Sequence, residues 1–159
     1  MNKLILSFFL IFCTLSFANA KSDIPQFSEY PATIYKGKSA KLDMSDPDAR
    51  MFRTRLSEAL KEPVSFGGEY VITMWGCGTM CRSYSLVNKK TGRVLKDGFG
   101  GEEQQEDVIG AKPNSNLIIT KEEILNDDYE VDHIIIRFYA LEKGKFKLLK
   151  TTKKQPTER

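Results

Sequence analysis

Apolar and polar residues alternate along most of this chain, in short runs separated by turn-forming residues. Such alternation is typical of half-buried β-strands. The run at 69–75 differs because it is apolar at both alternating sets of positions, which predicts a central strand covered on both faces. Short strands are expected at 32–35, 40–43, 69–75, 82–87, 93–95, 117–120, 131–141 and 146–150.

One segment follows a helical period instead. Ala49, Phe52, Leu56, Ala59 and Leu60 recur at the spacing of one helix face. Residues 45–48 supply a cap and a proline suited to the first helical position, and the proline at position 63 ends the pattern. The apolar stripe needs a partner surface, so we expect this helix to pack on the sheet that follows.

These elements predict an α+β fold, because strands joined by short turns pair antiparallel. We expect an antiparallel β-meander of about six to eight short strands with one amphipathic helix packed on it. A barrel of strands with a peripheral helix is the alternative. Residues 97–107 are interpreted as a Gly-rich and then acidic loop, and residues 121–128 as a short helical turn or a loop.

The N-terminus has the three parts of a secretory signal peptide. Lys3 precedes an apolar run from Leu4 to Phe17, and small residues end the segment at Ala20. The apolar run is shorter than the roughly 20 residues that span a membrane, which favours cleavage over an uncleaved anchor. The expected organisation is a signal peptide at 1–20, an extended lead-in at 21–31, a single domain at 32–152 and a flexible basic tail at 153–159. The protein is therefore expected to be exported, either periplasmic or secreted.

Cleavage would also change the cysteine count. Cys13 leaves with the signal, so Cys77 and Cys81 remain as a pair in an oxidising compartment, which favours a disulfide. Loss of Lys3 lowers the formal charge of the chain from +3 to +2. This near balance gives no reason to expect nucleic acid or an anionic membrane surface as a partner.

The stretch around the cysteines resembles a family of small uncharacterised exported bacterial proteins. The residues that carry the resemblance read F-G-G-E-Y at 66–70, W-G-C-G-T-M-C at 75–81 and T-G-R-V at 91–94, and F-R-T-R-L at 52–56 is also similar. The C-terminal strands show a weaker likeness. The resemblance implies a bacterial envelope location and a W-G-C-G-T-x-C hairpin. It implies no catalytic residues.

Four interpretations of this hairpin compete. It is a disulfide-stapled structural turn, or a recognition loop that presents a fixed set of side chains to a partner. It is also compatible with a soft-metal site or with thiol redox chemistry. The recognition residues would be Trp75, Met80, Arg82 and Tyr84. The metal ligands would be Cys77 and Cys81, with His133 supplied by another strand.

Other chemistry-bearing residues give weaker signals. His133 is the only histidine and adjoins Asp132, which is typical of a surface or structural histidine. The acidic residues at 102–107 do not match a calcium loop and are interpreted as solvated. We therefore expect a non-enzymatic binding or structural protein without a cofactor, whose partner is an envelope protein or a glycan. A soft-metal-binding or thiol-redox protein is the alternative.

Overall fold

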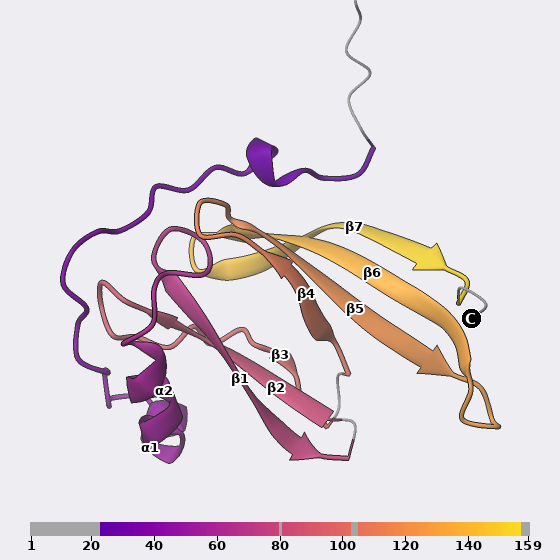
Figure 1. Ribbon diagram of the computed structural model, residues 1–159, viewed down its shortest axis with the longest axis horizontal. Coiled ribbons are helices and arrows are strands. Elements are labelled where there is room, and N and C mark those ends of the chain that lie inside the picture. The colour runs from indigo at the N-terminus through magenta and orange to yellow at the C-terminus, as the bar shows by residue number, and fades with distance from the viewer. Residues whose placement is uncertain (1–22, 80, 103–104, 157–159) are drawn as a thin grey trace, which may run out of the picture.

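The computed structural model describes residues 23–79, 81–102 and 105–156, and these residues are rich in β-structure (Figure 1). The strands form two antiparallel sheets, one of three strands and one of four. The first sheet holds β1 (Tyr70–Gly78), β2 (Cys81–Asn88) and β3 (Phe99–Gly100), in that order. The second holds β4 (Asp107–Ala111), β5 (Leu117–Leu125), β6 (Val131–Glu142) and β7 (Lys145–Lys154).

The expected β-rich, antiparallel character is confirmed, but the single meander is not, because the strands divide between two sheets. The 97–107 segment contains β3 and the first residue of β4, where a loop was expected. Residues 121–125 continue β5 instead of forming a turn. Their charges are accommodated within the strand because Glu122 binds Arg137 of β6 and Lys121 binds Glu123.

Two of the expected strands lie outside the sheets. The segments at 32–35 and 40–43 run along the molecule and make isolated backbone hydrogen bonds to turns. The Tyr35 amide donates to the Gly68 carbonyl at 2.7 Å, and the Asp43 amide donates to the Gly92 carbonyl at 2.9 Å. The strand expected at 93–95 is reduced to a single bridge between Val87 and Val94. The expected central strand β1 is covered on both faces but lies at the edge of its sheet.

The helical segment is two short helices, α1 (Pro47–Met51) and α2 (Arg53–Ala59), where one was expected. They meet at Phe52, whose backbone (φ −103°, ψ 22°) departs from helical geometry. Asp46 caps α1 through its side chain, which accepts the Asp48 amide at 2.8 Å. A 3₁₀ turn, η1 (Phe27–Glu29), precedes them. None of the helices in the described ranges is long and apolar enough to cross a membrane.

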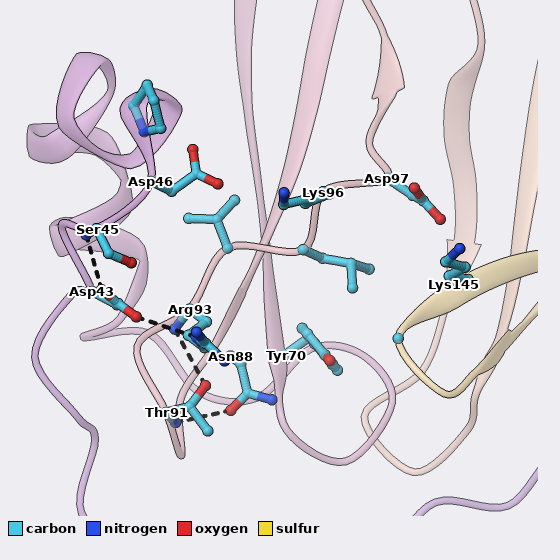
Figure 2. Close-up of a pocket in the computed structure, with 14 residues that line it drawn as sticks. Asp43, Ser45, Asp46, Tyr70, Asn88, Thr91, Arg93, Lys96, Asp97 and Lys145 are labelled. Carbon is cyan, nitrogen blue, oxygen red and sulfur yellow. Dashed lines mark hydrogen bonds and ion pairs between the residues drawn. The ribbon is translucent and has the colours of Figure 1, made fainter.

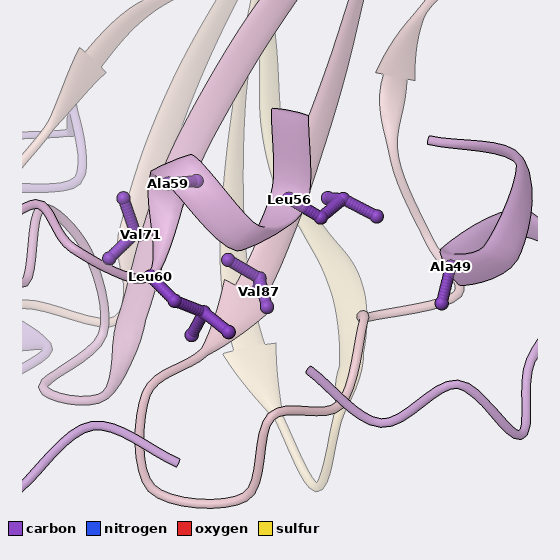
Figure 3. Packing of buried hydrophobic residues seen from close by; sticks show 6 residues of the cluster. All are labelled: Ala49, Leu56, Ala59, Leu60, Val71 and Val87. Atoms are coloured by element: carbon purple, nitrogen blue, oxygen red, sulfur yellow. The ribbon is translucent and has the colours of Figure 1, made fainter. Parts of the chain in front are cut away.

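The predicted apolar stripe does pack on the first sheet. Leu56, Ala59 and Leu60 of the helical segment are buried against Val71 of β1 and Val87 of β2 (Figure 3). Full burial of a leucine or valine side chain contributes about 1.5–3 kcal/mol. The helices thereby cover one face of the β1–β2 hairpin and leave its other face to the second sheet.

A second apolar core joins the two sheets. Phe66, Leu86 of β2 and Phe99 of β3 meet Ile118 of β5, and all four are buried. The outer face of the four-stranded sheet is covered by the segment before α1, whose Phe27 and Tyr30 pack near Leu117 and Phe138. The backbone of this segment is fixed at Ser115, whose hydroxyl lies 2.9 Å and 3.0 Å from the carbonyl oxygens of Phe27 and Tyr30.

The turn after β2 shows why the T-G-R-V part of the resemblance motif contains glycine. The Asn88 side chain accepts hydrogen bonds from the amides of Lys90 and Thr91, which forms an Asx turn. Figure 2 shows the contact with Thr91. Gly92 follows with φ +76°, and a Cβ there would collide with the carbonyl oxygen of Lys41. Only glycine combines this backbone conformation with so close an approach.

Candidate functional site

The β1–β2 hairpin ends in the two cysteines, and we call residues 74–82 the hairpin tip. Trp75 pairs with Ser83 and Gly76 with Arg82, after which the register shifts so that Gly78 pairs with Cys81. The sulfur atoms of Cys77 and Cys81 lie at disulfide-bonding distance, with their Cα atoms 5.1 Å apart. The expected cysteine pair is therefore brought together, and it closes the tip.

The predicted recognition residues divide between the two faces of the hairpin. Trp75 faces the helices, and its ring centroid lies 4.7 Å from that of Phe52. Arg82 and Tyr84 occupy the opposite face, which continues into the core between the sheets. Met80 lies outside the described residues.

Arg82 and Tyr84 share one partner in the other sheet. The Arg82 guanidinium donates to Asp107 Oδ2 at 2.6 Å, and the Tyr84 hydroxyl donates to Asp107 Oδ1 at 3.0 Å. Burial raises the pKa of Tyr84 above its ordinary value, and the Asp107 carboxylate raises it further. Asp107 is the first residue of β4, so these two contacts hold the hairpin, near its tip, to the four-stranded sheet.

Among the tip residues that the structure describes, Met74 is the exposed large apolar side chain, and it was not among the expected recognition residues. It lies directly opposite Tyr84 and is 47% exposed, whereas Ile72, two residues earlier on the same face, packs into the core. The alternation in 69–75 places Met74 and Ile72 on one face. What it could not reveal is that the second sheet covers Ile72 and leaves Met74 largely uncovered.

A small charged groove lies beside the tip. Its volume is about 260 Å³, and Arg82 forms one side of it. The remaining lining comes from the start of β4 and from β5, namely Gln105, Asp107, Lys121, Glu123 and Leu125. Its charges are internally paired, since Arg82 binds Asp107 and Lys121 binds Glu123 at 2.7 Å.

The acidic segment before β4 was interpreted from its sequence as solvated. The structure shows instead that one of its residues, Glu106, is buried. Glu106 is 8% exposed and accepts hydrogen bonds from Arg137 and from the Tyr139 hydroxyl. Arg137 also binds Glu122 at 2.7 Å. Burial raises the pKa of Tyr139 to about 12, and the charge of Glu106 contributes to this shift. These contacts form a structural network, because a buried carboxylate requires charged and hydrogen-bonding partners.

The alternative metal set is not assembled. His133 lies on β6 of the four-stranded sheet, where its Nδ1 contacts Asp132 Oδ2 at 2.5 Å. This hydrogen bond holds the pKa of Asp132 below its ordinary value. Among residues 23–79, 81–102 and 105–156, no three His, Cys, Asp or Glu side chains are grouped so that they could hold a metal ion. His133 therefore does not join Cys77 and Cys81.

No family model, curated protein or solved structure matches this chain.

Proposed function

We propose that this chain is an exported, non-enzymatic binding protein of the bacterial envelope, and that it recognises a partner protein through the hairpin tip. The observation that carries the proposal is an exposed methionine on a tip that is closed by two cysteines and anchored by Asp107. Export is supported by the signal-like sequence at 1–20, which lies outside the described residues.

The contacts of the tip support recognition because they fix its conformation before any partner arrives. Cys77 and Cys81 close a short loop. Arg82 forms an ion pair with Asp107, and the Trp75 ring packs against the ring of Phe52. A surface that is already ordered loses less conformational entropy on binding. A flexible tip of the same composition would bind more weakly.

The side chains that remain accessible are of the types that interfaces favour. Methionine and arginine are enriched in protein–protein interfaces. Met74 is 47% exposed, and the Arg82 side chain is 53% exposed although it is paired. This composition favours a protein partner over a metal ion or a small polar molecule at the tip.

The proposal is tested by photo-crosslinking with the full chain in the organism that encodes it. A photoreactive amino acid replaces Met74 in one variant and Met51 in another. Met51 is the matched control because it is a 74% exposed methionine on α1, outside the hairpin. We expect a discrete adduct with one envelope protein from position 74 and none from position 51. Identical adducts from both positions, or no adduct from position 74, would contradict the proposal.

Export and closure of the tip have separate tests. N-terminal sequencing of the protein recovered from the envelope is expected to begin at Lys21, and an intact Met1 would refute cleavage.

The recovered protein is then unfolded and its thiols are titrated, and no free thiol is expected. Two free thiols would show that Cys77 and Cys81 are not bonded to each other.

A further inference from the structure

A larger cavity lies at the other end of the hairpin, far along β1 and β2 from the tip. Its volume is about 870 Å³, within the usual range for small-molecule sites. Three parts of the chain form its walls: the start of α1 at Asp46, the connection that follows β2, and the turn between β6 and β7 at Lys145 (Figure 2). Tyr70, at the start of β1, also lines it.

The acidic groups of this cavity already have partners. Asp43 accepts the Ser45 amide at 2.9 Å and the Arg93 guanidinium at 3.2 Å (Figure 2). These interactions hold the pKa of Asp43 below its ordinary value, the Ser45 amide having the largest effect. Asp46 accepts the Asp48 amide, and Asp97 accepts the Phe146 amide at 3.3 Å. Each of the three carboxylates therefore accepts a hydrogen bond from a group of the protein itself.

The two lysines of the cavity are in the opposite situation. Lys96 and Lys145 line it from different walls, and neither side chain makes a hydrogen bond or an ion pair within the described part of the chain. The Tyr70 hydroxyl, which also lines the cavity, has no hydrogen-bond partner there either. The cavity thus presents unused donors, and two of them carry positive charge. These unpaired, positively charged donors are the groups that bind an anion.

The remaining lining defines the body of the ligand. Val94, Leu95 and the ring of Tyr70 give an apolar surface, and the exposed side chain of Thr91 adds a hydroxyl group. A sugar ring has both an apolar face and hydroxyl groups, so it matches this mixture. We propose that the cavity binds an acidic monosaccharide unit, with the carboxylate placed between Lys96 and Lys145 and the ring placed against Tyr70.

The proposal is tested by titrating the full chain with glucuronate and following its backbone amide chemical shifts. Saturable shifts are expected at Tyr70 and Arg93 and around the two lysines. Glucose has a similar ring without the carboxylate and is expected to bind at least about tenfold more weakly, since charge-assisted hydrogen bonds are the strong ones. Inorganic phosphate, an anion without the ring, is also expected to bind more weakly than glucuronate.

Variants separate the site from general charge attraction. Lys96→Gln/Lys145→Gln is expected to weaken glucuronate binding at least about tenfold. Lys61→Gln is the control, because Lys61 is an exposed lysine that lines a different pocket. Both lysines of the site are exposed, so the double variant is expected to keep its fold, which circular dichroism checks.

Three results would overturn the proposal: no saturable shifts with glucuronate, equal binding of glucose or phosphate, or unchanged binding in the double variant. The hairpin tip is not part of this cavity. Failure here therefore leaves the proposed partner recognition at the tip untouched, and failure of the crosslinking experiment leaves this site untouched.

Discussion

Arg82 and Asp107 form an ion pair of 2.6 Å that links β2 of the three-stranded sheet to β4 of the four-stranded sheet. Tyr84 adds a second hydrogen bond to the same carboxylate. Because the pair is partly exposed, its own contribution to stability is modest. Its structural effect is larger, since it fixes the hairpin near its tip against the second sheet.

Replacing Asp107 by asparagine is expected to lower the free energy of unfolding by about 1–2 kcal/mol, through loss of the ion pair and weakening of the hydrogen bond from Tyr84. The pKa of Tyr84 should fall part of the way toward 10.0, because burial, its largest cause, remains. Urea unfolding measures the first effect, and the ultraviolet absorbance of the phenolate measures the second. Asp127→Asn, in the exposed turn after β5, is the control and is expected to change neither quantity.

Tyr139 gives a pH-dependent prediction. Its pKa is raised from 10.0 to about 12 in the folded protein, so the folded state keeps this proton when the unfolded state has lost it. The resulting stabilisation is fully present below pH 10 and is lost as the pH rises toward about 12. Tyr139→Phe is expected to be less stable at neutral pH, because the hydrogen bond to Glu106 is lost.

The difference in stability between the wild type and Tyr139→Phe should therefore shrink across the alkaline range. Unfolding by urea at a series of pH values measures it. Tyr129→Phe is the control, because Tyr129 is 86% exposed and should follow the wild type throughout. A difference that stays constant from pH 10 upward would show that the Tyr139 pKa is not raised.

The elements that local sequence pattern defines were predicted, and those that depend on distant partners were not. Antiparallel strands and the apolar stripe with Leu56 follow from spacing, and the pairing of Cys77 with Cys81 follows from their short separation and from the expected loss of Cys13 with the signal peptide. The burial of Glu106 depends on its contact with Arg137, which lies 31 residues away in the sequence. When that contact is not known, the sequence of a partly buried acidic segment cannot be distinguished from the sequence of a solvated loop.

The resemblance motif is explained largely by packing. Phe66 is fully buried between the sheets. Gly68 and Gly92 both have φ +76°, and a Cβ at either position would collide with a carbonyl oxygen of the segment before α1. These motif residues are therefore needed for the fold whatever the partner is. Met74 lies between the motif's F-G-G-E-Y and W-G-C-G-T parts, which is one reason why the motif did not single it out.

Leu56 tests the packing of the helical segment. Leu56→Ala is expected to cost about 2–5 kcal/mol, because the side chain is 1% exposed and its removal leaves a cavity against the first sheet. Glu58→Ala on the exposed side of α2 removes only a surface ion pair with Lys61 and should cost less than about 0.5 kcal/mol. Thermal or urea unfolding compares the two. Equal losses would mean that α2 is not packed as described.

Thr120 offers a stabilising substitution. Its side chain is completely buried on β5, and its hydroxyl oxygen has no hydrogen-bond partner among the described residues. Valine has nearly the same shape without the hydroxyl, so Thr120→Val is expected to raise the free energy of unfolding by about 1 kcal/mol. Thr152→Val, at a half-buried position of β7, is the comparison and should have a smaller effect. A loss of stability in Thr120→Val would contradict this environment.

The central claim, recognition through the hairpin tip, is tested most directly by the affinity of the protein that crosslinks at position 74. Its dissociation constant is measured for wild type, Met74→Ala and Met51→Ala by calorimetry. Interface anchors typically contribute 2 kcal/mol or more, so Met74→Ala is expected to weaken binding at least about tenfold, while Met51→Ala leaves it unchanged. Equal affinities for wild type and Met74→Ala would contradict recognition through this tip.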